Sequence, residues 1–280
     1  MNLTDAARHF ASNLNPVTED AVLEARLIIQ KVTGLSRPVL LSHPERLLSE
    51  SEITAIQSLV EQRIRGIPLP YLLGEWEFFG HPFFVNPSVL IPRPETELLV
   101  EQASSWLMKH PAICRGFDIG TGSGCIAISL LLAHPELQMY AVDIRRDTLR
   151  TAVSNAVRHG CRERFHPVQA DIFSALKCEA HLICANLPYI PTKTCSLIEP
   201  ARFEPMTALD GGADGFELYR LLFEQITDKI RGDYLIACEI EYRQREQALK
   251  TAETFFPESQ ILVLEDLAGQ PRLLLIQNTE

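Results

Sequence analysis

Apolar residues recur at helical spacing through the first quarter of the chain. Between residues 3 and 73 they return every three or four positions, as at Ile53 and Ile56. Ser49 and Glu52 stand before one such run with the spacing of a capping box, in which each satisfies a free backbone N–H near the other. Residues 1–75 are therefore predicted to form a small helical domain.

The pattern changes over residues 75–91, which read EWEFFGHPFFVNPSVLI. Aromatic and apolar side chains stand on both sides of Gly80-His81-Pro82, a turn signal. This arrangement is typical of a β-hairpin. We expect a hairpin linker over residues 76–92, with the domain boundary inside it.

After Glu95, short apolar runs alternate with helical segments, which is typical of a doubly wound parallel sheet in an α/β fold. The expected strands are residues 114–119, 138–143, 164–170, 181–185, 233–240, 260–265 and 272–277. The expected helices are residues 95–109, 124–134, 146–158, 215–229 and 243–254. The gap between the last two strands is too short for a crossover helix, so they should pair antiparallel and leave one reversed strand at the end of the sheet.

The net charge of the chain indicates which classes of partner it is suited to bind. The 280 residues carry 26 basic and 36 acidic side chains, a formal net charge of −10. That is the wrong sign for a protein whose affinity comes from neutralising phosphates. Residues 1–75 carry seven basic and nine acidic side chains, with no block of either sign. Direct binding to nucleic acid is not expected.

Cysteine use and hydropathy indicate the compartment. The seven cysteines contain no C-x-x-C pair and stand mostly in apolar stretches, so we expect buried thiols in a reducing compartment. The first twenty residues hold no apolar leader segment, and the apolar run at residues 125–133 is too short to span a bilayer. A cytoplasmic protein without membrane attachment is expected. The eight histidines have no metal-ligand spacing, and no metal is expected.

A glycine-rich loop follows the first strand of this region: Gly120, Thr121, Gly122, Ser123 and Gly124, preceded by an acidic residue. The spacing is G-x-G-x-G, whereas dinucleotide sites use G-x-G-x-x-G to seat a pyrophosphate. A cofactor without phosphates therefore fits better. The alternative is that these glycines serve only tight packing of helix on strand.

Two further strand ends carry acidic residues. Asp143 ends the second strand, where a carboxylate can accept both hydroxyls of a ribose. Asp171, followed by Ile172, ends the third strand near the expected position of an adenine. The alternative reading of each aspartate is a helix cap.

The fourth strand ends at Asn186-Leu187-Pro188-Tyr189, which we call the NLPY loop. It resembles the [N/D]-P-P-[Y/F/W] motif of amino-methyltransferases, whose target nitrogen has a lone pair delocalised into a carbonyl or ring. The Asn186 side-chain oxygen and the Leu187 carbonyl can both accept from one NH2 group and favour positive charge on its nitrogen. Tyr189 can pack on the planar group. The alternative is an ordinary loop with a proline turn.

Further segments resemble the protein-(glutamine-N5) methyltransferases that modify translation release factors. They are Pro68-Leu69-Pro70-Tyr71, Val89-Leu90-Ile91-Pro92-Arg93-Pro94-Glu95-Thr96-Glu97, Arg202-Phe203-Glu204-Pro205, Ala208-Leu209-Asp210-Gly211-Gly212 and Asp266-Leu267-Ala268-Gly269. The resemblance implies a seven-stranded Rossmann-like methyltransferase domain over residues 93–280, with S-adenosyl-L-methionine as the cofactor. It implies release factors as protein substrates, held by residues 1–75 and entering a cleft between the two domains.

The resemblance also assigns the site. Asn186, Pro188 and Tyr189 are the expected catalytic residues, and Leu187 joins them in binding substrate. The cofactor is expected to be held by Asn186 together with the glycine loop, Asp143, Asp171 and Ile172. An adenine-N6 methyltransferase acting on DNA or RNA is the alternative enzyme, since an adenine amino group poses the same electronic problem. A non-catalytic binding module on the same fold is the third possibility.

One position departs from the family pattern, because the family usually has proline where this chain has Leu187. A backbone carbonyl does not depend on its side chain, and Pro188 still favours an extended conformation at Leu187. What is lost is the φ angle that a proline ring fixes. We expect the acceptor geometry to survive.

Overall fold

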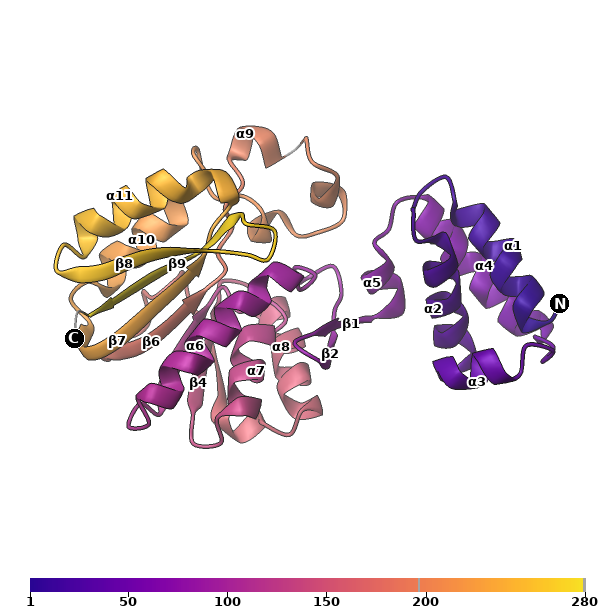
Figure 1. Ribbon diagram of the computed structural model, residues 1–280, viewed down its shortest axis with the longest axis horizontal. Helices are drawn as coiled ribbons and strands as arrows, with labels where there is room; N and C mark the ends of the chain where they lie inside the picture. The colour runs from indigo at the N-terminus through magenta and orange to yellow at the C-terminus, as the bar shows by residue number, and fades with distance from the viewer. Residues whose placement is uncertain (196, 279–280) are drawn as a thin grey trace. The chain divides into compact units, whose positions relative to one another are not determined.

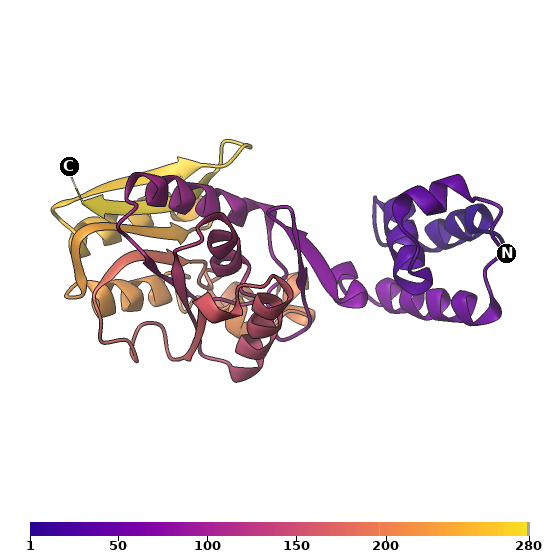
Figure 2. The same cartoon turned by 90° about the horizontal axis from the view of Figure 1, so that it is seen from below.

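The computed structural model describes residues 1–195 and 197–278, and the chain divides into two compact units. Unit 1 is Met1–Glu75 and unit 2 is Trp76–Glu280. Each unit has a hydrophobic core of its own. Figures 1 and 2 show the helices of unit 1 and the sheet of unit 2.

Unit 1 is mainly helical, with one isolated β-bridge between Asn2 and Leu47. Its helices are α1 (Leu3–Leu14), α2 (Ala21–Thr33), α3 (Arg37–Ser42), α4 (Glu50–Ile64) and α5 (Leu69–Leu73). The predicted capping box is confirmed, since the Ser49 hydroxyl accepts from the Glu52 N–H and the Glu52 carboxylate from the Ser49 N–H. Its core contains Phe10, Ile28 and Ile56, each almost fully buried.

The predicted hairpin is present but shorter than residues 75–91. It consists of β1 (Glu75–Phe78) and β2 (His81–Phe84), joined through Phe79 and Gly80 at φ of 51° and 73°. Two consecutive positive φ angles are the signature of a tight hairpin turn that matches the twist of its strands. The pairing stops at Phe84, before prolines that lack the N–H a sheet ladder needs. Although we expected it as a linker, the hairpin packs into the core of unit 2.

Unit 2 contains a seven-stranded sheet in the order β5-β4-β3-β6-β7-β9-β8. The strands are β3 (Arg115–Ile119), β4 (Gln138–Asp143), β5 (Phe165–Gln169), β6 (Ala180–Ala185), β7 (Ile230–Glu239), β8 (Ser259–Glu265) and β9 (Pro271–Asn278). All seven predicted strands are confirmed to within about three residues at each end. β3 is third in this order, between β4 and β6, and both pairings are parallel.

The reversed strand is β9, and it lies inside the sheet, whereas we expected it at the end. It pairs antiparallel with β7 on one side and with β8 on the other. Leu273 to Ile276 are four consecutive buried apolar residues, which suit a strand covered on both faces. β8 alternates in burial and is nowhere fully buried, which suits an edge strand. The burial pattern therefore explains why the last strand inserts between its neighbours.

Helices cover both faces of this sheet (Figures 1 and 2). One face carries α6 (Glu97–Lys109), α7 (Cys125–Ala133) and α8 (Arg146–Arg158), which bury Trp106, Ile128 and Ala152. The other carries α10 (Glu217–Ile226) and α11 (Arg245–Phe255), which bury Phe223 and Ala252. The shorter elements are α9 (Thr192–Cys195), η1 (Pro94–Thr96), η2 (Arg162–Arg164), η3 (Glu199–Arg202), η4 (Met206–Ala208) and η5 (Tyr242–Gln244).

Most of the cysteine side chains are buried, as the sequence indicates. Five of the seven cysteines are buried or nearly so, but Cys114 is exposed, contrary to the expectation for an apolar stretch. It directly precedes β3, at the sheet edge opposite the glycine loop.

Among the residues that the structure describes, no helix is long and apolar enough to cross a membrane.

Candidate functional site

The glycine loop connects β3 to α7 at the carboxyl edge of the sheet. Gly120, Gly122 and Gly124 all have positive φ angles, between 55° and 83°. Asp118 stabilises the loop from below, because its Oδ2 accepts from the Thr121 hydroxyl at 2.7 Å and from the Ala127 N–H at 3.2 Å. Complete burial raises the pKa of Asp118 to about 6.

The three glycines have different roles. A Cβ at Gly120 would lie 3.0 Å from Leu187 Cδ2, so this glycine lets the NLPY loop approach. A Cβ at Gly122 would meet nothing closer than 3.9 Å, which leaves open space for a ligand. At Gly124 a Cβ would lie 3.2 Å from Ala152 Cβ, so the packing alternative holds at this position.

Asp143 connects β4 to the glycine loop. Its Oδ2 accepts from the Gly122 N–H at 3.2 Å and its Oδ1 from the Arg145 N–H at 2.9 Å. Each oxygen therefore keeps one lone pair free. Burial raises the pKa of Asp143 above its ordinary value. The carboxylate is held rigidly and can still accept from a ligand.

A cavity of about 450 Å³ extends from the glycine loop along the ends of β4 and β5. Gly120, Asp143, Asp171 and Ile172 all line it, as the sequence suggested. Its described lining contains three aspartates, of which Asp210 is the third, and neither lysine nor arginine. An acidic lining beside an open glycine backbone fits a hydroxyl-bearing or cationic ligand better than a phosphate.

Asn186, the first residue of the NLPY loop, is anchored by its NH2 group. Asn186 Nδ2 donates to Glu239 Oε2 and to Thr96 Oγ1, both at 3.0 Å. The Thr96 hydroxyl in turn donates to Glu239 Oε2 at 2.6 Å. Burial raises the pKa of Glu239 to about 7. Because the NH2 face is used in this triad, the Asn186 Oδ1 is the atom left for an incoming donor.

The rest of the NLPY loop is fixed through its backbone. The Leu187 N–H donates to the Tyr219 hydroxyl at 3.1 Å, and that hydroxyl donates to the Glu239 carbonyl. Gln244 Nε2 donates to the Tyr189 carbonyl at 3.1 Å. We expected the φ angle at Leu187 to be free, because no proline ring fixes it. The hydrogen bond to Tyr219 instead restricts the Leu187 peptide, and nothing in the sequence pattern indicates that bond.

The segment after η4 is shaped to fit against the NLPY loop. A Cβ at Gly211 would lie 2.5 Å from the Pro188 carbonyl oxygen, and one at Gly215 2.3 Å from the Tyr189 carbonyl oxygen. The Gly211 N–H donates to the Ile190 carbonyl at 2.8 Å. The lack of a Cβ at these two glycines therefore lets the segment from residue 208 to 215 pack directly against the backbone of the NLPY loop.

Two cavities meet at Asn186. A narrow one of about 70 Å³ joins Asn186 to Gly122 and Asp143. A second, of about 200 Å³, is lined by Asn186 and Tyr189 together with Leu90, Arg93, Ile198 and Pro200. Asn186 thus lies between the glycine-loop side and a mostly apolar cavity of suitable size for a side chain.

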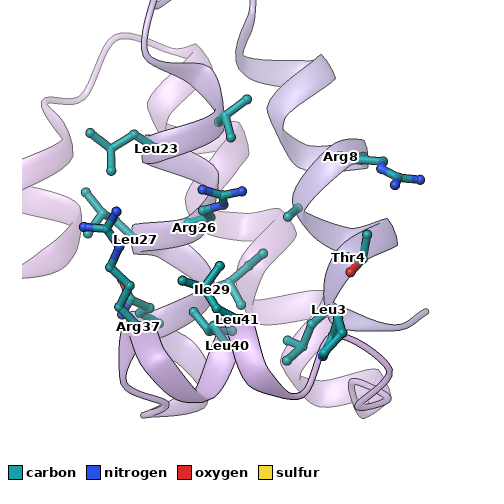
Figure 3. A pocket seen from close by; sticks show the side chains of 14 residues that line it. Leu3, Thr4, Arg8, Leu23, Arg26, Leu27, Ile29, Arg37, Leu40 and Leu41 are labelled. Carbon is teal, nitrogen blue, oxygen red and sulfur yellow. The ribbon is translucent and has the colours of Figure 1, made fainter.

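Another cavity, of about 430 Å³, lies within unit 1 between α1, α2 and α3 (Figure 3). None of the site residues predicted from sequence lines it. It is mostly apolar and carries three arginines.

Sequence reasoning missed four residues that hold the site: Thr96, Tyr219, Glu239 and Gln244. Thr96 lies in the segment from residue 89 to 97 but had no role. Glu239 is the acidic residue at the end of β7, as Asp143 is at the end of β4, and that signal could have identified it. Tyr219 and Gln244 lie on α10 and η5 and gave no local signal.

Sequence comparisons find family models that match parts of the chain and related proteins that match nearly all of it. The family model of the PrmC N-terminal domain matches residues 5–74, and that of a precorrin methyltransferase domain matches residues 110–181. The release factor glutamine methyltransferase of Nitratidesulfovibrio vulgaris is 36% identical over 276 residues, covering 95% of this chain and 92% of that protein. A bifunctional methyltransferase of Rickettsia bellii is 31% identical over 285 residues. The match covers 91% of this chain but only 50% of that protein.

A solved structure supports the fold. The N-terminal domain of human METTL16 in complex with SAH aligns with a TM-score of 0.53 at 16% identity, covering 89% of this chain and 93% of that one. At this identity the likeness concerns the fold alone.

Proposed function

The chain belongs to the release factor glutamine methyltransferases, and from this membership we propose that it methylates the side-chain amide nitrogen, N5, of the glutamine in the Gly-Gly-Gln motif of peptide-chain release factors. The methyl donor is S-adenosylmethionine, which supplies an electrophilic methyl group on a sulfonium centre. The products are N5-methylglutamine and S-adenosylhomocysteine.

The orientation of Asn186 is the observation that carries this proposal. Its NH2 group is committed to Glu239 and Thr96, so Oδ1 is available to accept from a substrate NH2 group. Asn186 also lines both the cavity next to the glycine loop and the apolar cavity beside Tyr189. An acceptor between two cavities suits a reaction that joins a group from one to a nitrogen in the other.

The two acceptors address the weak nucleophilicity of an amide. The Asn186 side-chain oxygen and the Leu187 carbonyl each accept one N–H of the substrate NH2 group and stabilise positive charge as the new N–C bond forms. Tyr189 packs on the planar amide, and the loop aligns its nitrogen for in-line attack. The C–S bond breaks with its electrons on sulfur. The nitrogen loses its proton to water after it has become cationic, so no residue must act as a base beforehand.

The glycine-loop side fits the proposed cofactor. The Asp143 carboxylate has lone pairs free for a ribose diol, and Gly122 leaves space for close approach of a ligand. Asp171 and Ile172 line the same cavity farther along and are proposed to contact the adenine. The acidic lining suits a sulfonium cation, and its described residues include neither the lysine nor the arginine that a phosphate would favour.

An adenine-N6 methyltransferase is not favoured. The family relationship indicates glutamine, and the net charge of −10 opposes binding to a polyanion. The deciding experiment is incubation of the purified protein with labelled S-adenosylmethionine and either a folded release factor or an oligonucleotide, followed by mass spectrometry. One added methyl on a single glutamine is expected. Methylated adenine with an untouched release factor would reject the proposal.

A further inference from the structure

Two hydrogen-bond chains from the NLPY loop end on one residue of β7, Glu239. The first runs from the side chain of Asn186 directly to the Glu239 carboxylate at 3.0 Å. The second runs from the Leu187 N–H through the Tyr219 hydroxyl to the Glu239 backbone carbonyl. Asn186 and Leu187 are the two residues that supply the proposed acceptors for the substrate amide.

We propose that Glu239 is the positioning residue of the reaction and orients both acceptors at once. Its carboxylate selects the Asn186 amide orientation, and its carbonyl, through Tyr219, fixes the Leu187 peptide. This inference rests on the proposed function, and it adds a residue that contacts neither substrate nor cofactor.

The carboxylate is suited to selecting one amide orientation. A side-chain amide can rotate by 180° and exchange its oxygen with its NH2 group. In the observed orientation the NH2 group faces Glu239 Oε2, which only accepts when ionised. The opposite orientation would place two oxygens against each other and present a donor to the substrate. Thr96 reinforces the choice, since its hydroxyl donates to Glu239 and must therefore accept from Asn186.

Burial makes this selection strict. Glu239 is 2% exposed, so water cannot replace a lost partner. Arg272 and Glu95 exert opposing charge effects on Glu239, while burial raises its pKa to about 7. A protonated carboxyl can carry its proton on Oε1 and still accept at Oε2. An amide oxygen at this position could do the same, which makes glutamine an informative replacement.

Tyr219 supplies at Leu187 what a proline ring supplies in the motif this loop resembles. A proline fixes φ and has no N–H to satisfy. Leucine leaves φ free and adds a buried donor, which the Tyr219 hydroxyl accepts at 3.1 Å. Tyr219 and its link to Glu239 therefore compensate for the departure at this position.

The first experiment compares Glu239→Leu with Glu239→Gln, measuring kcat, KM for a folded release factor and affinity for S-adenosylhomocysteine. Glu239→Leu should lower kcat by about tenfold to a hundredfold, the range for loss of a residue that orients a reacting group, with cofactor affinity unchanged. Glu239→Gln should keep kcat within about fivefold, because its amide oxygen can replace Oε2. Glu24→Leu is the matched control for kcat, as it removes another buried carboxylate, which pairs with Arg63 in unit 1.

The outcomes separate this inference from the proposed function. If the wild-type protein does not methylate the release factor, the function itself is wrong. If the wild type is active and Glu239→Leu turns over equally fast, or glutamine causes the same loss as leucine, the positioning role is wrong.

The second experiment tests the Leu187 branch by rescue. Tyr219→Phe removes the acceptor of the Leu187 N–H and should lower kcat by about tenfold. Adding Leu187→Pro removes that donor and fixes φ, so Tyr219→Phe should lower kcat by no more than about threefold when Leu187→Pro is already present. A purely structural role for Tyr219 predicts an equal loss with and without Leu187→Pro, and that result would overturn this branch.

A second and independent inference concerns the groove between α1, α2 and α3 of unit 1. Nine of its fourteen lining residues are apolar, three are arginines and none is acidic. Figure 3 shows Arg8 on the α1 side, and Arg26 and Arg37 on the α2 and α3 side. Leu23 and Leu41 at the groove are 50% and 58% exposed.

The charges indicate what this groove binds. Arg8, Arg26 and Arg37 have no carboxylate within ion-pair distance in the part of the chain that the structure describes, whereas Arg46 and Arg63 of the same unit pair with Glu52 and Glu24. Unpaired arginines beside exposed leucines complement a segment with one acidic and one apolar face. We infer that the groove docks an acidic amphipathic helix of the release factor, a partner that rests on the proposed function.

The test compares a folded release factor with a short synthetic peptide containing Gly-Gly-Gln. The double variant Arg26→Glu/Arg37→Glu should lower kcat/KM for the folded protein by about tenfold or more and leave kcat/KM for the peptide unchanged, since the peptide has no docking helix. Arg65→Glu is the matched control, because Arg65 is exposed in the same unit but outside the groove.

Three results would reject the groove as a docking site for substrate. One is an unchanged kcat/KM for the folded protein, and another is an equal loss for protein and peptide. The third is binding to phosphatidylglycerol vesicles, or self-association, that the double variant alone removes. A wild type inactive on both substrates would instead reject the proposed function.

Discussion

Arg93 Nη2 donates to Glu204 Oε2 at 2.6 Å, and this ion pair connects segments 111 residues apart. The other oxygen of Glu204 accepts from the Ile91 N–H at 3.2 Å. The Glu204 side chain is 1% exposed and that of Arg93 36% exposed. The pair therefore joins the segment before α6 to the segment before η4, on two sides of the cavity next to Asn186.

Arg93→Ala should destabilise unit 2 by about 3 kcal/mol, because it leaves the buried carboxylate of Glu204 without its cation. Urea unfolding followed by circular dichroism measures the loss. Arg145→Ala is the control, since Arg145 pairs with a half-exposed Asp147 and its removal should cost under about 1 kcal/mol. Equal losses in the two variants would contradict the structural role of the Arg93 pair.

Asp118 should make the free energy of unfolding depend on pH. Its pKa is about 6 in the folded chain against an ordinary 3.8, so between these values the folded state holds a proton that the unfolded chain has released. The free energy of unfolding contributed by this group therefore falls as pH rises from about 4 to 6, by about 3 kcal/mol for two pKa units.

Asp118→Asn has no such proton to lose. The difference in unfolding free energy between variant and wild type should therefore shift in favour of the variant by that amount between pH 4 and pH 7. Parallel curves for the two proteins would show that the carboxyl does not titrate in this window.

Asp143→Ala should weaken binding of S-adenosylhomocysteine by about 1.5–3 kcal/mol, the range for hydrogen bonds to a charged group. Isothermal titration calorimetry measures it. Because Asp143 also accepts from Gly122 and Arg145, a thermal melt must show that the variant is folded. Unchanged affinity in a folded variant would remove Asp143 from the cofactor site.

Sequence patterns predicted the elements of unit 2 because each depends on neighbours along the chain. The strand ending at Asp143 is recognisable from a run of six residues, and the turn at Gly80 from three. The position of β9 between β7 and β8 was not predicted, although its four consecutive apolar residues indicate a strand covered on both faces.

The candidate site was predicted where a strand end carries the chemistry, as at Asn186. The residues that orient Asn186 were not, because Glu239 lies 53 positions away and Thr96 lies 90. One sequence contains no record of which buried polar groups satisfy one another. Only the fold reveals that the acid ending β7 faces the amide ending β6.

Leu187→Pro should fold and keep kcat within about tenfold of wild type. It removes the N–H that bonds to Tyr219, but no buried donor is left unsatisfied, and the Tyr219 hydroxyl still donates to Glu239. The loss of a buried leucine side chain should lower stability by about 1–2 kcal/mol. Steady-state kinetics with a thermal melt measures both. Complete loss of turnover in a folded variant would mean that the loop depends on leucine packing against Gly120.

Asn186→Ala should reduce turnover by about 10²–10³, by analogy with the loss of a preorganised group that stabilises transition-state charge. It removes the acceptor for the substrate NH2 group, while the glycine loop and Asp143 remain. Affinity for S-adenosylhomocysteine should therefore change little. Single-turnover methylation of a folded release factor, read by mass spectrometry, measures the rate.

The same variant separates protein from nucleic acid as substrate. A nucleic-acid enzyme should bind oligonucleotides with an affinity that falls steeply as salt rises, since each contacted phosphate releases a counterion. With a net charge of −10, this chain should show no such binding, in wild type or in Asn186→Ala. The release factor should carry one methylated glutamine after reaction with wild type and none, over the same time, with the variant. Salt-sensitive oligonucleotide binding with adenine methylation that Asn186→Ala abolishes would instead establish the nucleic-acid enzyme.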